Sequence, residues 1–151
     1  MSLETKVMDV MKEAMKAKDD KTLRSVRAIK AAIILAKTSE GAKGEITEDD
    51  EIKLLQKLVK QRKDSLEIFN TQNRPELAAK EQEEIDVISK FLPEQLEGDA
   101  LKAVLVKILA DAGASSPADM GKAMGAANKQ LAGKADGKSI STLVKEILNG
   151  N

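Results

Sequence analysis

Hydrophobic residues recur at three- and four-residue steps along most of the chain, and polar residues fill the positions between them. Near the start, Leu3, Val7, Val10 and Ala14 keep this spacing. Such a period returns apolar side chains to one face of a helix at every turn. A half-buried strand would instead show apolar and polar residues in strict alternation. Seven segments follow the helical period, and these are residues 2–17, 21–37, 47–71, 75–92, 99–112, 116–131 and 139–148. The pattern therefore predicts an all-α protein.

Several of these segments begin with residues that favour helix starts. Thr47 is followed by acids in the first turn, and Pro75 suits a first turn, where its missing N–H costs nothing. Residues 116–119, Ser-Pro-Ala-Asp, combine a capping hydroxyl, a first-turn proline and a nearby acid. Ser139 is the predicted cap of the last helix. Residues 39–46, which include two glycines, form a predicted flexible break before the third helix.

The spacing of the segments also predicts a domain boundary. Residues 47–71 and 75–92 are long and separated by a short connection, so we expect an antiparallel helical hairpin. After the linker at 93–98 the helical segments become shorter and richer in alanine and glycine. We therefore assign residues 1–96 to an N-terminal helical domain and residues 97–151 to a small C-terminal domain.

A charged residue interrupts the apolar stripe of each long segment. Arg62 and Glu81 lie at similar depths when counted from the connection between the segments, so we expect Arg62 to pair with Glu81 or Glu84. One alternative is a polar functional site, and another is that Arg62 lays its aliphatic stem over the apolar face. We favour a structural ion pair, because ionisable groups on helix faces are mostly structural.

Composition narrows the possible chemistry. The 151 residues include no His, Cys, Trp or Tyr and only two Phe. Without Cys or His, disulfides, thiol nucleophiles, Cys or His zinc sites and the familiar catalytic triads are excluded. Carboxylate pairs and oxygen-ligand sites stay possible because the chain has 25 acidic residues. We predict no catalytic residue, no metal site and no cofactor.

Charge and hydropathy say less about the binding partners and the location of the protein. Lys plus Arg and Asp plus Glu both number 25, so the net charge is zero. From Asp99 onward there are seven lysines and five acids, a balance of +2, which leaves −2 for residues 1–98. No apolar run approaches the roughly 18 residues that span a bilayer, and no secretory signal is visible. We therefore expect no membrane partner and take the cytoplasm as the default location.

Two glycine-containing stretches near the C-terminus are distinctive. Gly121 and Gly125 share one helix face, which favours close packing of another helix over an exposed patch for RNA or protein. The turn at 133–138, Gly-Lys-Ala-Asp-Gly-Lys, precedes a helix N-terminus that favours an anion such as phosphate. The alternative is an ordinary turn with solvated lysines. The turn at 133–138 is not a P-loop, because it lacks the P-loop order Gly-x4-Gly-Lys-Ser/Thr.

Short motifs spread along nearly the whole chain resemble the YqeY-like proteins, also called the GatB/YqeY family. The matching motifs are MKAKD at 15–19, KQRKDS at 60–65, RPELA at 74–78, FLPEQL at 91–96, DMGK at 119–122 and GKADGK at 133–138. The resemblance implies an N-terminal helical domain and a small C-terminal three-helix bundle. That bundle is similar to the tail of the B subunit of the glutamine-dependent tRNA amidotransferase, which engages tRNA.

The resemblance implies a tRNA-binding accessory that acts in trans with a tRNA amidotransferase or an aminoacyl-tRNA synthetase. The family label is a carbon–nitrogen ligase with glutamine as amido-nitrogen donor. The sequence contains no ATP-binding loop and no glutaminase nucleophile, so we expect no intrinsic catalysis.

Scarce aromatic residues leave little base stacking, so bound RNA would be held by shape and phosphate contacts. The candidate RNA-binding residues are Lys122, Lys129, Lys134, Lys138 and Lys145. The alternative is a protein-interaction module that docks an enzyme of that pathway without contacting RNA, through the glycine face or the long hairpin.

Overall fold

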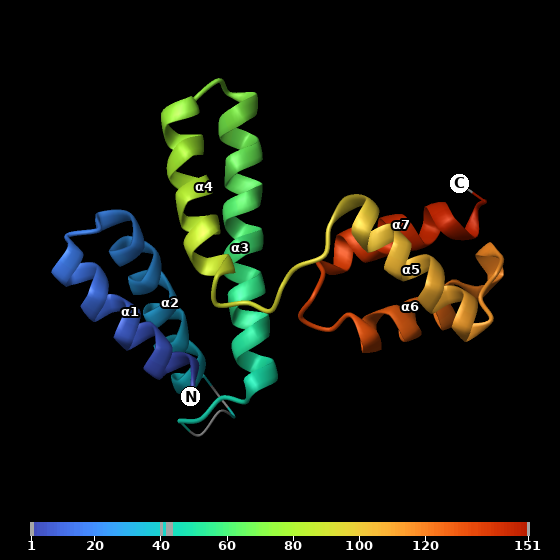
Figure 1. Cartoon of the computed structure of the whole chain (residues 1–151), viewed down its shortest axis with the longest axis horizontal. Helices are drawn as coiled ribbons and strands as arrows, with labels where there is room; N and C mark the ends of the chain where they lie inside the picture. Colours follow the sequence, from blue (N-terminus) through green and yellow to red (C-terminus); the bar gives the residue numbers. More distant parts are fainter. Residues whose placement is uncertain (1, 40, 42–43, 151) are drawn as a thin grey trace. The chain divides into compact units, whose positions relative to one another are not determined.

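In the computed structural model, which describes residues 2–39, 41 and 44–150, all regular structure is helical (Figure 1). The elements are α1 (Leu3–Ala17), α2 (Asp20–Thr38), α3 (Glu48–Thr71), α4 (Pro75–Ser89), α5 (Gly98–Ala112), the 3-10 helix η1 (Pro117–Asp119), α6 (Met120–Gln130) and α7 (Gly137–Leu148). The predicted all-α class is confirmed, with seven α helices and no strand in the described residues. The predicted break at 39–46 includes residues 40, 42 and 43, which lie outside the described residues.

The chain divides into two compact units, Met1–Leu92 and Pro93–Asn151. Each unit buries its own hydrophobic core, and the two cores share no residue. Residues 93–96 have no helical structure, and they group with the second unit. Within the described part of the chain, no helix is both long enough and apolar enough to cross a membrane.

Helices α1 to α4 build the first unit. Helices α3 and α4 lie side by side and are joined by a short connection at residues 72–74 (Figure 1). Helix α2 packs against both α1 and α4, and Ile29 and Ile88 are fully buried between the helices. The buried core residues are Leu3, Val7, Val26, Ile29, Ile33, Leu55, Val59, Ile85 and Ile88. All are aliphatic and recur at helical spacing, as the sequence pattern predicts.

Helices α5, α6 and α7 surround the second core and contact one another pairwise. The buried residues of this core are Leu101, Leu105, Ile108, Leu109, Ala114, Ala123, Ala127, Leu131, Ala135, Ile140, Val144 and Leu148. Leu96, from the segment before α5, packs against the same core. The buried residues that α6 contributes are the alanines Ala123 and Ala127, whereas α5 and α7 contribute bulkier aliphatic residues.

Side-chain caps fix several helix starts. Thr47 and Asp50 form a reciprocal capping box at the start of α3, with N–H to oxygen distances of 3.1 Å in both directions. Ser116 and Asp119 form a second box, but it opens the 3-10 helix η1 and α6 follows at Met120. Both predicted starts therefore contain real caps.

The predicted cap of the last helix is wrong. Helix α7 begins at Gly137, and its cap is Asp136, whose side chain accepts the Ser139 N–H at 3.1 Å. Ser139 lies in the first turn and also donates its hydroxyl to Asp136. Aspartate caps as well as serine does, so Asp136 can start the helix three residues earlier than Ser139 would.

Candidate functional site

The five predicted RNA-binding lysines all have exposed side chains. Lys122 and Lys129 are seven residues apart on α6, and Lys138 and Lys145 have the same separation on α7, so each pair shares a helix face. Lys134 lies in the turn between these helices. From residue 120 to 150 there are five lysines and two acids, which gives a local balance of 5 − 2 = +3.

The glycine face of α6 is open. Gly121 and Gly125 are exposed, and a Cβ atom added at either position would meet nothing within 4 Å. The favoured prediction of close packing at these glycines is therefore wrong. The small residues that permit close approach are Ala123 and Ala127, which are both fully buried. They lie on the opposite side of the helix from the glycines.

The turn between α6 and α7 alternates buried and exposed residues. Leu131, Gly133 and Ala135 are buried, whereas Lys134 between them is exposed. Gly133 has φ of +77°, a left-handed conformation that glycine adopts without steric cost. Two buried neighbours therefore anchor the backbone that presents Lys134 to solvent.

The start of α7 does not offer the predicted anion site. The Asp136 carboxylate already caps this helix start, where it accepts both the N–H and the hydroxyl of Ser139 at 3.1 Å. A negative charge of the chain itself thus satisfies the helix N-terminus. The backbone at this helix start is therefore already capped, whereas Lys134 and Lys138 beside it remain exposed.

Asp119 lies close to the lysine set, one turn before Lys122. Its carboxylate accepts the backbone N–H groups of Ser115 and Ser116 at 2.9 and 3.2 Å. These two hydrogen bonds, with a smaller contribution from Lys122, lower the pKa of Asp119. The carboxylate is thereby committed to the helix start and remains ionised at neutral pH.

Arg62 lies at the centre of an ionic cluster in the first unit. Its Nε is 3.8 Å from Glu84 Oε1, and Arg24 Nε lies 3.7 Å from the same oxygen. The Arg62 guanidinium also donates to the Leu58 carbonyl at 3.0 Å. Within the described chain, no acceptor hydrogen-bonds to its buried Nε. Burial, and then the nearby Glu84, raise the pKa of Glu81, while Arg62 and Arg24 oppose that rise.

Sequence reasoning missed the members of this cluster that come from α2. Arg24 donates to Glu83 at 3.0 Å, and Lys21 lies 3.3 Å from another oxygen of Glu83. Arg24 sits beside the apolar stripe of its helix and is 59 residues from Glu83, so no local pattern links them. With Arg62, Glu81 and Glu84 the cluster carries three cations and three carboxylates. Its balanced charge favours a structural role over catalysis.

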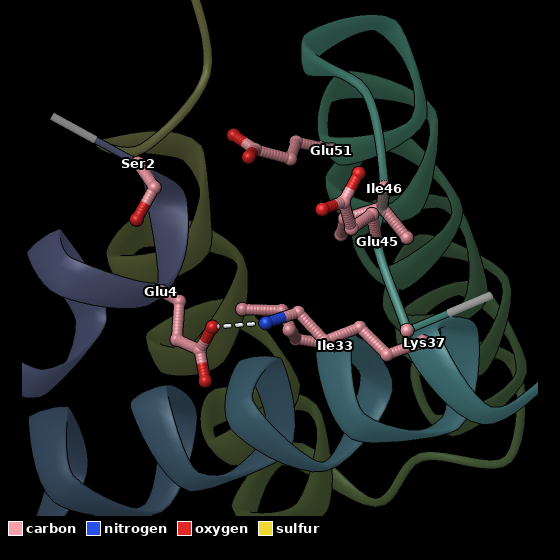
Figure 2. A pocket seen from close by; sticks show the side chains of 8 residues that line it. Ser2, Glu4, Ile33, Lys37, Glu45, Ile46 and Glu51 are labelled. Carbon is pink, nitrogen blue, oxygen red and sulfur yellow. Dashed lines mark hydrogen bonds and ion pairs between the residues drawn. The ribbon is translucent and has the colours of Figure 1, made fainter. Parts of the chain in front are cut away.

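A cavity of about 240 Å³ opens where α1, the end of α2 and the start of α3 meet (Figure 2). It is lined by Ser2, Glu4, Ile33, Lys37, Gly44, Glu45, Ile46 and Glu51. Figure 2 shows the Lys37 ammonium group pointing at the Glu4 carboxylate, and the two form an ion pair. Glu51 Oε2 accepts the Leu3 N–H at 3.3 Å.

These contacts already use much of the polar lining of the cavity. The described residues contain no group of three or more acidic side chains arranged to hold a metal ion. No sequence pattern pointed to this cavity, because its lining comes from three separate segments.

Comparison with known protein families assigns the chain as a whole. The model of the family described as "Yqey-like protein" matches residues 4–148, which is nearly the full length. The chain belongs to the YqeY-like family. The family predicted from the short motifs is therefore confirmed at this level, and the match extends over most of both units of this YqeY-like protein.

Similar proteins occur in fungi. A protein of Pyrenophora tritici-repentis named "Altered inheritance of mitochondria protein 41, mitochondrial" is 31% identical over 140 residues, which cover 91% of this chain and 76% of that protein. A protein of the same name from Saccharomyces cerevisiae strain YJM789 is 38% identical over 84 residues. That match covers 54% of this chain and 44% of the yeast protein.

These names contradict the cytoplasmic location expected for this YqeY-like protein. The relatives are named as mitochondrial proteins. The expectation rested only on the lack of a membrane span and of a visible signal, and neither feature distinguishes one aqueous compartment from another. The cytoplasmic assignment is therefore wrong.

Proposed function

We propose that this YqeY-like protein binds structured RNA, with tRNA as the first candidate, through a basic surface on α6, the following turn and α7. The basic surface consists of Lys122, Lys129, Lys134, Lys138 and Lys145. The observation that carries the proposal is that all five lysines are exposed while only two acids lie in the same stretch. Clustered cations of this kind bind phosphates and release counterions.

The shape of α6 supports contact with a nucleic-acid backbone. Gly121 and Gly125 leave the main chain of α6 bare near Lys122 and Lys129, which supports close approach of a phosphate backbone at these two positions. Base stacking contributes little, because both phenylalanines, Phe69 and Phe91, are half-buried in the first unit. Recognition by shape and phosphate position therefore fits better than readout of unpaired bases.

The link to tRNA amidation rests on the GatB/YqeY resemblance alone. Packing of α5, α6 and α7 around one core supports interpreting them as the three-helix bundle which that resemblance implies. In this proposal the protein acts in trans as an accessory of a tRNA amidotransferase or an aminoacyl-tRNA synthetase. The names of the fungal relatives refer to mitochondrial inheritance and mention no substrate.

The open face of α6 also favours a second candidate function. A flat helix face with no side chain at Gly121 and Gly125 accommodates a partner helix at short distance. The protein would then dock an enzyme of the pathway without contacting RNA. Such a complex depends on the shape of the face rather than on charge, so salt weakens it little.

The test is binding of the purified protein to total tRNA across a salt series. A variant with Lys122, Lys129, Lys134 and Lys138 changed to Gln removes four cations of the basic surface. The matched control changes four exposed lysines of the first unit to Gln, namely Lys6, Lys12, Lys57 and Lys80. Both variants lower the net charge by four, so they differ only in where the charge is removed.

The proposal expects micromolar or tighter binding that weakens as salt rises. It also expects the basic-surface variant to lose affinity and salt dependence, with a slope reduced by roughly 0.7–0.9 for each phosphate that is no longer neutralised, while the control keeps both. Equal losses in the two variants would show that only net charge matters. Absence of binding at low salt removes the RNA function and makes a search for protein partners of the α6 face the next step.

A further inference from the structure

We infer that Gln95 is a positioning residue for the basic surface, an inference that rests on the proposed RNA-binding function. Gln95 lies in the non-helical segment before α5, 38 residues away from Gly133 in the turn that carries Lys134. Both hydrogen bonds given for its side chain go to backbone carbonyls. It acts through the backbone of the turn.

Hydrogen bonds tie the segment before α5 to the turn after α6. The Gln95 side-chain amide donates to the Gly133 carbonyl at 2.7 Å and to the Pro93 carbonyl at 2.8 Å. The next residue, Leu96, donates its backbone N–H to the Lys134 carbonyl at 2.8 Å. Two successive carbonyls of the turn thus accept hydrogen bonds from two successive residues of the segment.

These bonds add to the burial of Leu131 and Ala135 in holding the turn. Gly133 has no side chain, so its backbone has wide conformational freedom, and here it adopts a left-handed φ of +77°. Lys134 donates its own N–H to the Leu131 carbonyl at 2.9 Å, which holds only the α6 side of the turn. The bonds from Gln95 and Leu96 hold the outer side, so they set the direction in which the Lys134 side chain leaves the surface.

Gln95 is half-buried, so water competes less for its hydrogen bonds than it does for those of a surface side chain. Losing the hydrogen-bond donor costs more free energy at a partly buried carbonyl than at an exposed one, because water replaces the donor less readily there. Leu96 reinforces the arrangement by packing on the core of the second unit. The segment before α5 is therefore a fixed part of the lysine-bearing turn rather than a free tether.

The test uses the full-length protein and compares Gln95→Met with Gln61→Met. Methionine keeps the length of glutamine but removes the two donated hydrogen bonds, and Gln61 is an exposed glutamine on α3 that serves as the matched control. Gln95→Ala is the second variant if the methionine protein folds poorly. Each change is also made in a Lys134→Gln background. Affinity for total tRNA is measured at fixed salt, alongside the melting temperature.

We expect Gln95→Met to weaken tRNA binding about three- to fivefold, comparable to the removal of one lysine–phosphate interaction, and Gln61→Met to leave it unchanged. In the Lys134→Gln background, Gln95→Met should have no further effect. A general structural role would instead weaken binding equally in both backgrounds, because it does not act through Lys134.

The outcomes separate this inference from the proposed function. If the basic-surface variant loses tRNA binding but Gln95→Met binds as well as the wild type, the positioning role is overturned and the RNA function stands. Equal weakening in both backgrounds overturns it as well. If the wild type does not bind tRNA, or the basic-surface variant binds normally, the proposed function fails and the inference fails with it.

Discussion

Arg62 and Arg24, from different helices, both lie against the same oxygen of Glu84, with Nε to Oε1 distances of 3.8 and 3.7 Å. Glu84 is therefore the acid that connects α2, α3 and α4 in the first unit. The side chains of Arg62 and Glu84 are only 16% and 15% exposed, so solvent screens their interaction less than it screens a surface pair.

Replacing Glu84 by Gln should destabilise the first unit by about 2–4 kcal/mol, because it removes the carboxylate that lies 3.8 Å from the partly buried Arg62. Urea unfolding followed by circular dichroism measures the change. Glu67→Gln, at an exposed position on α3, is the control and should alter stability by less than about 0.5 kcal/mol. A Glu84→Gln protein as stable as the control would show that the cluster contributes nothing.

Glu81→Gln should raise the stability of the first unit at neutral pH. Burial raises the pKa of Glu81, so the folded state binds its proton more tightly than the unfolded chain does. This carboxyl therefore opposes folding, and stability falls as pH rises from its ordinary pKa through the raised one.

The measurement is the unfolding free energy of both proteins between about pH 4 and pH 8. The advantage of Glu81→Gln should shrink as pH falls, because the wild-type carboxyl becomes protonated. Glu83 behaves in the opposite sense, because its bond to Arg24 lowers its pKa and its stabilisation is lost on acidification. A Glu81→Gln advantage that is the same at every pH would contradict the assignment.

Asp136→Ala should cost about 1 kcal/mol of stability in the second unit, the usual loss for an N-cap. Ser139→Ala should cost less, since it removes a hydroxyl that only donates to Asp136 while the Ser139 N–H stays capped. Thermal unfolding of the two variants distinguishes the observed cap from the one that the sequence suggested. The reverse order of effects would favour Ser139 as the cap.

Gly125→Ala should stabilise α6 by about 0.5–1 kcal/mol, because alanine is the better helix former and its Cβ meets nothing within 4 Å. Gly113→Ala is the matched contrast. Gly113 also has open space around it, but its φ of +75° is strained for any residue with a side chain, so this change should destabilise. Destabilisation by Gly125→Ala would contradict the open surroundings of this glycine.

The separate cores predict separate responses to core truncation. Leu105→Ala should destabilise the second unit by about 2–5 kcal/mol, and Ile29→Ala the first unit by a similar amount. Hydrogen exchange resolved by segment shows which unit loses protection. Loss of protection throughout the chain in both variants would mean that the two units unfold as one.

Part of the candidate site was predictable because its signal is local. Exposure of Lys122 and Lys129 follows from a helix whose other face carries Ala123 and Ala127. The partners of Arg24 were not predictable, since they depend on which face of α2 meets α4. The sequence also did not determine that Gly121 and Gly125 are exposed, because two glycines at this spacing are compatible with a packed helix face and with an exposed one.

The sequence by itself determined the helical class, the approximate helix limits and the capping box of Thr47 with Asp50, because all of these depend on interactions within a few residues. The ion pair of Arg62 with Glu84 is one of the two that the sequence predicted, whereas only the tertiary structure decided that Arg24 meets the same carboxylate and that Gln95 holds the carbonyl of Gly133. Those contacts join residues that are tens of positions apart. Their partners are selected by how whole helices pack, and a single sequence carries no local pattern that records that choice.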